Sequence, residues 1–275
     1  MKQFLFSILV VLAGPFLSAL QAAEMRLAVT TSFHNSGLSD VLIPEIKRDL
    51  DLDVRLLVVG TGQALKLGRS GDVDAILVHS RRAEDEFVAE GFGTHRREIM
   101  YNDFVIVGPL GDPAAIGKAT TAIEALIAIS TAKTVFVSRG DDSGTHRREL
   151  ALWARAKIKS SAFTPDWYRA AGSGMGATLN TASGMNGYVL SDRASWLKFR
   201  NKGNLKILFQ RGAALFNQYA YLPVSSAKHP HVKSTHAAAL ENWLTSAKAQ
   251  TLIGGYRIND QVLFTPNAKP ENDGS

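Results

Sequence analysis

Cysteine is absent from all 275 residues of the chain. This absence excludes disulfide bonds, thiolate metal sites and an N-terminal cysteine that could carry a lipid anchor. The nucleotide-binding patterns G-x-G-x-x-G and G-x-x-x-x-G-K-S/T are also missing, since Gly172-Ser-Gly-Met-Gly176 does not fit the first of them. We therefore expect neither a nucleotide cofactor nor thiolate chemistry.

Beyond the N-terminus, the chain lacks any apolar run long enough to span a bilayer. The N-terminal end combines a positive charge at Lys2, an apolar stretch from Phe4 to Leu20 and small residues from Ala19 to Ala23. This pattern is typical of a cleavable signal peptide, which we place at residues 1–23. We expect a periplasmic protein that is free in solution after cleavage.

The chain also lacks runs of mixed basic and aromatic residues, although its formal net charge is +6. Such a diffuse surplus argues against nucleic acid as a partner and suits an anionic ligand. The hydrophobic fraction of 45% is ordinary for a globular fold, and this length permits two lobes with separate cores.

Strand-like and helix-like segments alternate along most of the sequence, which predicts open α/β sheets. Three polar segments follow predicted strands: residues 31–37, 60–62 and 138–145. We interpret the first and the third as polar loops and the second as a tight turn, each of which leads into a helix. Because ligands of open α/β sheets bind outside the carboxyl ends of the strands, we expect these segments to meet at a binding site.

The segment 134–150 indicates what this site binds. A strand pattern leads into Ser138-Arg-Gly-Asp-Asp-Ser-Gly-Thr145, and good helix formers follow from Arg147. Backbone N–H groups at the start of a helix lack intrahelical partners and favour negative charge. Arg139 lies inside this loop, where a guanidinium can bind an oxyanion with two parallel hydrogen bonds.

Several long motifs carry a resemblance to a known family: Thr30-Thr-Ser32, Ser36-Gly-Leu38, Val59-Gly-Thr-Gly-Gln-Ala64, Met100-Tyr-Asn-Asp-Phe-Val-Ile-Val-Gly-Pro109, Ser138-Arg-Gly-Asp-Asp-Ser-Gly-Thr-His146, Gly174-Met-Gly-Ala-Thr178 and Asp192-Arg193. They resemble the substrate-binding proteins of tungstate ABC importers, the TupA type. The resemblance implies a type II periplasmic-binding-protein fold, in which two lobes of open mixed sheet flanked by helices hold the ligand between them. We place lobe I at residues 24–108 and 217–266, lobe II at 109–216 and a disordered tail at 267–275.

The resemblance also implies a set of ligand-binding residues: Thr31, Ser32, Thr61, Arg139, Ser143, Gly144 and Thr145. Their chemistry agrees with it, because a tetrahedral dianion without protons offers only acceptors and needs hydroxyl, backbone N–H and guanidinium donors. The expected ligand is tungstate, with molybdate as an alternative, and no cofactor or metal ion is expected. The expected partners are the permease and ATPase of the importer, and the protein is expected to be a monomer.

Phosphate is a competing ligand, because phosphate-binding proteins share the pattern of Arg139, Asp141, Ser143, Gly144 and Thr145. In that family the carboxylate accepts a proton from the ligand, whereas we expect Asp141 to hold Arg139 and its loop. The chain departs from the tungstate family at Phe33, where relatives usually have threonine, and we expect this ring to pack behind the site.

A periplasmic hydrolase that uses Ser143 and His146, with Asp142 as the acid, is the more distant alternative. These residues crowd one helix start, which argues against a catalytic triad, and no G-x-S-x-G elbow is present. We therefore expect no enzymatic activity. His229, His231 and His236 lack the regular spacing of metal ligands and read as loop residues.

Overall fold

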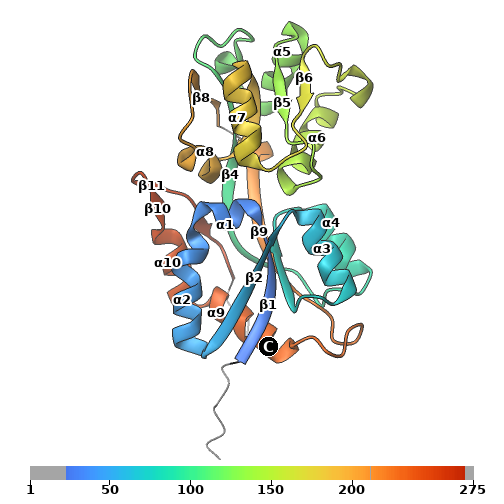
Figure 1. Cartoon of the computed structure of the whole chain (residues 1–275), viewed down its shortest axis with the longest axis vertical. Helices are drawn as coiled ribbons and strands as arrows, with labels where there is room; N and C mark the ends of the chain where they lie inside the picture. Colours follow the sequence, from blue (N-terminus) through green and yellow to red (C-terminus); the bar gives the residue numbers. More distant parts are fainter. Residues whose placement is uncertain (1–22, 211, 270–275) are drawn as a thin grey trace, which may run out of the picture.

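The computed structural model describes residues 23–210 and 212–269, which form two lobes connected by strands β4 and β9 (Figure 1). The predicted signal peptide lies outside these residues except for Ala23, which already pairs with Leu52 in the first sheet. No helix in the described part of the chain is long and apolar enough to cross a membrane.

The first lobe is built on a mixed sheet in the order β2-β1-β3-β9-β4, with β12 beside β4. Strands β1, β2 and β3 are parallel to one another, and β9 runs antiparallel to β3 and β4. The elements of this lobe are β1 (Ala23–Thr30), α1 (Thr31–Ser36), α2 (Leu38–Leu50), β2 (Leu52–Val59), α3 (Thr61–Ser70), β3 (Ala75–Val78), α4 (Arg81–Ala89), the first half of β4 (Arg97–Pro109), β9 (Phe216–Pro223), α9 (Ser234–Thr245), α10 (Ala247–Gly255), β10 (Arg257–Ile258), β11 (Gln261–Val262) and β12 (Thr265–Pro266).

Hydrophobic side chains cover both faces of this sheet, because successive residues of a strand point to opposite sides. In β1, Leu27 and Val29 pack with α2, α9 and α10, whereas Ala28 packs with α3 and α4 on the other face. Phe33 is buried in the first of these cores beside Tyr219, which confirms that its ring packs behind the polar segment.

The second lobe continues the sheet as β4-β7-β5-β6, with β8 also beside β4. Along β4, Phe104 and Ile106 pack against α5 and α6, and Val105 and Val107 pack against α7 and α8. The elements of this lobe are the second half of β4, η1 (Ile116–Lys118), α5 (Ala122–Ala132), β5 (Phe136–Ser138), α6 (Gly144–Arg155), η2 (Ser160–Ala162), β6 (Tyr168–Ala170), α7 (Met175–Met185), β7 (Tyr188–Asp192), α8 (Arg193–Lys198), β8 (Leu205–Phe209) and η3 (Ala213–Leu215).

The first crossing between the lobes lies inside β4. Its first half, up to Asp103, pairs with β9, and from Phe104 onward it pairs with β7 and β8. We therefore place this boundary between residues 103 and 104 instead of after 108, because one long strand serves both sheets. The return crossing lies where η3 leads into β9, next to the expected residue 217.

Two further segments differ from the sequence interpretation. The polar segment after β1 contains the short helix α1, which begins because the Thr30 side chain accepts a hydrogen bond from the Phe33 backbone N–H. The first residues of the predicted tail are hydrogen-bonded, since Asn267 contacts Gln218 and Ala268 donates to Gln250. Residues 270–275 lie outside the described part.

Candidate functional site

The carboxyl ends of the strands in the first lobe bring its polar segments together. Thr30 pairs with Val59 at the ends of β1 and β2, and Val29 pairs with Leu77 near the end of β3. Because these strands are parallel and in register, the residues that follow them lie at one edge of the sheet. Thr31, Thr61 and His79 all occupy this edge, as the sequence predicts for the first two.

The second lobe contributes the loop after β5 and the start of α6. Ser143 caps this helix, since its Oγ accepts a hydrogen bond from the His146 backbone N–H at 3.2 Å. Accepting this bond leaves the hydroxyl proton of Ser143 free to donate to a ligand. Gly144 and Thr145 are the first helical residues, so their N–H groups have no partner within the helix.

The two lobes touch where α6 begins. A Cβ atom added to Gly144 would lie 2.4 Å from His79 Cε1, 2.7 Å from His79 Nδ1 and 3.0 Å from Thr61 Oγ1. Such distances are far shorter than ordinary contacts of about 3.5–4.0 Å. Gly144 therefore permits a close approach between the lobes, and it places the start of α6 against the edge that holds Thr61.

Asp141 holds Arg139 and the loop, as expected. Its Oδ2 accepts hydrogen bonds from Arg139 Nε at 3.1 Å and Nη2 at 2.5 Å, and its Oδ1 accepts from the Ser143 backbone N–H at 3.2 Å. The Arg139 side chain is only 3% exposed. Asp141 thus compensates the buried guanidinium and leaves the Nη1 group of Arg139 available to a ligand.

Buried polar atoms without partners mark this region. Among the described residues, Thr61 Oγ1, His79 Nδ1, Asn102 Nδ2, Thr145 Oγ1 and Asp192 Oδ2 are buried and make no hydrogen bond. An unsatisfied buried polar group costs about 1–3 kcal/mol. Several such atoms near a contact between two lobes indicate a site whose hydrogen bonds are completed by a ligand.

Ser32 and Thr31 differ in their burial and in their contacts. Ser32 is buried, and its Oγ lies 3.1 Å from each of Thr30 Oγ1, His79 Nε2 and Tyr219 OH. The Ser32 hydroxyl is therefore used mainly in hydrogen bonds with the side chains around it, including His79 and Tyr219. Thr31 begins α1 and is half-buried at the same edge.

Sequence reasoning missed His79, Tyr219 and Asn102. A signal existed for His79, because it follows a strand at the same edge as the other segments. Tyr219 and Asn102 do not follow a strand, because they lie inside the crossing strands β9 and β4, although Asn102 belongs to the family motif at residues 100–109. There Asn102 pairs with Asn217, whose Nδ2 donates to Asn102 Oδ1 at 2.6 Å.

Burial lowers the pKa of His79 and, together with the nearby positive charges of Arg139 and Arg148, brings it to about 3. Its ring packs on Tyr219, with 4.7 Å between the ring centroids. The imidazole is therefore neutral at physiological pH and carries one proton, on either Nδ1 or Nε2.

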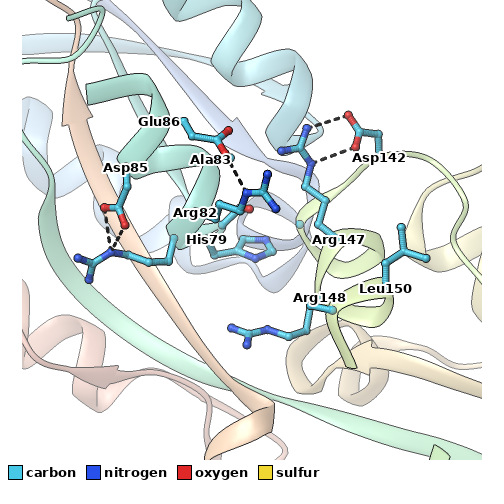
Figure 2. Close-up of a pocket in the computed structure, with 13 residues that line it drawn as sticks. His79, Arg82, Ala83, Asp85, Glu86, Asp142, Arg147, Arg148 and Leu150 are labelled. Carbon is cyan, nitrogen blue, oxygen red and sulfur yellow. Dashed lines mark hydrogen bonds and ion pairs between the residues drawn. The ribbon is translucent and has the colours of Figure 1, made fainter. Parts of the chain in front are cut away.

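A cavity of about 940 Å³ opens from this region between α4 and α6. Figure 2 shows His79 between the side chains of these two helices. Its lining includes four arginines, of which three pair with acids of their own helix or loop: Arg81 with Asp85, Arg82 with Glu86 and Arg147 with Asp142.

Arg148 is the fourth arginine of this cavity, and within the described chain it pairs with no carboxylate. Its Nη2 donates instead to the backbone oxygen of Phe216 at 2.8 Å. Because Asp141 neutralises Arg139, Arg148 supplies uncompensated positive charge close to the site.

The residues of the hydrolase alternative do not form a triad. His146 Nδ1 accepts a hydrogen bond from the Asp142 backbone N–H at 3.0 Å, and the Asp142 carboxylate binds Arg147. Ser143 contacts only the backbone N–H of His146 in this group. The base therefore does not reach the nucleophile, and no acid supports it.

Comparison with known proteins identifies the family. A model of the PBP superfamily domain matches residues 18–248. The tungstate-binding protein TupA of Peptoclostridium acidaminophilum is 44% identical over 246 residues, which cover 88% of this chain and 85% of that protein.

Two solved structures are also similar over most of their length. The tungstate-binding protein TupA of Desulfovibrio alaskensis G20 is 43% identical with a TM-score of 0.79, covering 90% of this chain and 100% of that one. The tungstate ABC transporter structure from Geobacter sulfurreducens is 45% identical with a TM-score of 0.77, covering 85% and 98%. The chain belongs to the PBP superfamily and, within it, to the family of TupA-type tungstate-binding proteins.

Proposed function

We propose that this protein captures tungstate in the periplasm and delivers it to the permease and ATPase of an ABC importer. The observation that carries the proposal is the set of buried, unpartnered donors at the contact between the lobes, above all the hydroxyls of Thr61 and Thr145. Relatives named for tungstate binding at 43–45% identity support the same conclusion.

The chemistry of the site suits an ion that accepts hydrogen bonds from every side. Hydroxyl groups of Thr61, Ser143 and Thr145, the N–H groups at the start of α6 and the Nη1 group of Arg139 all donate. Desolvating a dianion is expensive, so oriented donors from both lobes must replace its water. Helices α3 and α6 also begin here, and their positive ends favour the charge.

Phosphate fits this donor set less well, because its monoprotonated form needs an acceptor for its proton. The oxygens of Asp141 are already used by Arg139 and Ser143. Asp192 carries a free Oδ2, but burial raises the pKa of this carboxyl and shifts it toward the protonated form, which donates. A fully deprotonated tetrahedral ion therefore matches the site better than monohydrogen phosphate.

Tungstate and molybdate share charge and shape, so the donor set accommodates both. We propose tungstate as the preferred ion because the relatives named above carry that name. We also propose that residues 1–23 direct export and that the protein acts as a monomer, with one ion between its two lobes.

Competition calorimetry tests the proposed function. Purified mature protein is titrated with tungstate, molybdate, sulfate and phosphate, each alone and then against bound tungstate. We expect tungstate to bind tightly with one ion per chain, and phosphate to compete only at far higher concentration. Tight phosphate binding without tungstate binding would overturn the proposal.

A further inference from the structure

We propose that His79 contacts the oxyanion directly and donates a hydrogen bond to it from Nδ1, in a tautomer that Ser32 and Tyr219 select. The inference rests on the proposed function and adds a neutral, directional donor from the first lobe. It restricts the ligand to ions whose oxygen facing His79 carries no proton.

The position of the ring is the first argument. His79 is 6% exposed, and Nδ1 has no hydrogen-bond partner among residues 23–210 and 212–269. Nδ1 and Thr61 Oγ1 lie 2.7 Å and 3.0 Å from one point beside Gly144, where α6 of the other lobe begins. Two unpartnered polar atoms thus converge on the contact between the lobes, where the ion is proposed to bind.

The partners of the other ring nitrogen supply the second argument. Ser32 Oγ has three oxygen or nitrogen neighbours at 3.1 Å, and a hydroxyl can donate once and accept twice. The Thr30 oxygen already accepts from the Phe33 backbone N–H, so its own proton can be given to Ser32. If Tyr219 donates to Ser32 as well, Ser32 donates to Nε2 of His79.

In the proposed network, the direction of the Ser32 hydrogen bond sets the position of the His79 proton. When Nε2 accepts from Ser32, the single proton of the neutral ring lies on Nδ1, where it meets an oxygen of the ion. The opposite tautomer would aim a nitrogen lone pair at a dianion in a buried place. A bound anion and the Ser32 network therefore select the same tautomer.

The neutral state of the His79 ring defines what its contact with the ion contributes. Arg139 and Arg148 lie near enough to oppose a positive charge on the ring, and Figure 2 shows His79 beside Arg148. His79 therefore contributes direction and shape, while the arginines and helix ends contribute charge. The hydrogen bond also ties the ion to β3 and, through Ser32 and Tyr219, to α1 and the crossing strand β9.

A matched pair of substitutions tests the contact. The side-chain amide nitrogen of asparagine can occupy the place of Nδ1, whereas that of glutamine reaches the place of Nε2. We expect His79→Asn to bind tungstate within about 10-fold of the wild type. His79→Gln should bind about 10- to 100-fold more weakly, as for loss of a hydrogen bond to a charged group. Equal binding by His79→Gln and the wild type would overturn the inference.

Nitrogen NMR of the wild-type protein, labelled at its histidines, provides a readout that does not depend on folding of a variant. With tungstate bound, we expect Nδ1 of His79 to give the signal of a protonated nitrogen and Nε2 that of an unprotonated one. The reverse assignment would contradict the inference even if both variants bind weakly. Failure of the wild type to bind tungstate would instead contradict the proposed function itself.

Discussion

Replacing Gly144 with alanine tests the close approach of the two lobes. The added Cβ would lie 2.4 Å from His79 Cε1 and 3.0 Å from Thr61 Oγ1. An ordinary carbon contact needs about 3.5–4.0 Å, so the lobes must separate locally by roughly 1 Å. That separation lengthens hydrogen bonds of about 2.9 Å beyond the useful limit.

The cost of such overpacking is about 1–3 kcal/mol, which corresponds to about 5- to 150-fold weaker binding of tungstate. The substitution adds no backbone strain, because Gly144 begins α6 at a negative φ and alanine favours helix more than glycine does. Calorimetric titration measures the affinity, and thermal unfolding of the unliganded protein measures the stability.

Gly62→Ala provides the matched control on the opposite wall. Its Cβ would meet Asp142 Oδ2 at 2.7 Å, but that side chain is 68% exposed and can rotate away. Both glycines lie in the first turn of a helix, so the change in helix propensity is similar. Wild-type affinity in Gly144→Ala would refute the close approach in the bound state. Equal losses of affinity in both variants would show that the effect is not specific to the contact of Gly144.

The remaining predictions concern charge. Arg139→Ala should weaken tungstate binding at least about 100-fold in calorimetry, since it removes a charged donor and leaves Asp141 uncompensated; a loss below 10-fold would contradict its role. Arg148→Gln should slow tungstate association about 3- to 10-fold at low ionic strength and flatten its salt dependence in stopped-flow measurements, and an unchanged rate would exclude steering by this residue. Burial raises the pKa of Glu149 from 4.5 to about 7. Between these two pH values the folded state therefore holds a proton that the unfolded state releases. The free energy of unfolding falls by up to about 3 kcal/mol as pH rises from 4.5 to 7. Glu149→Gln should remove most of this fall in urea unfolding at pH 5 and pH 8, and an unchanged slope would show that Glu149 is not its source.

Local sequence determined most of the elements and one half of the site. Local residue types indicate the strands, the polar segments that follow them and the helices beyond. The strand end that carries Thr61 and the loop of Arg139 were therefore predictable. The family motifs then predicted two lobes, which the shared strand β4 confirms. Local patterns also placed Asp141 near Arg139, because only one residue stands between them in a tight loop.

Tertiary structure alone decided the boundary and the interior of the site. Strand β4 is one continuous strand from Arg97 to Pro109, and only its partners show that residues 97–103 belong to one sheet and 104–109 to the other. Tyr219 meets Ser32 across 187 positions of sequence, and no periodicity encodes such a contact.

The sequence by itself determined which chemical groups this protein presents at the ends of its strands: hydroxyls, free N–H groups at helix starts and one guanidinium. Only the tertiary structure decided that Gly144 of one lobe lies against His79 and Thr61 of the other. The physical reason is that donor types follow from residue identity, whereas their convergence depends on how two separately packed cores approach each other along β4 and β9.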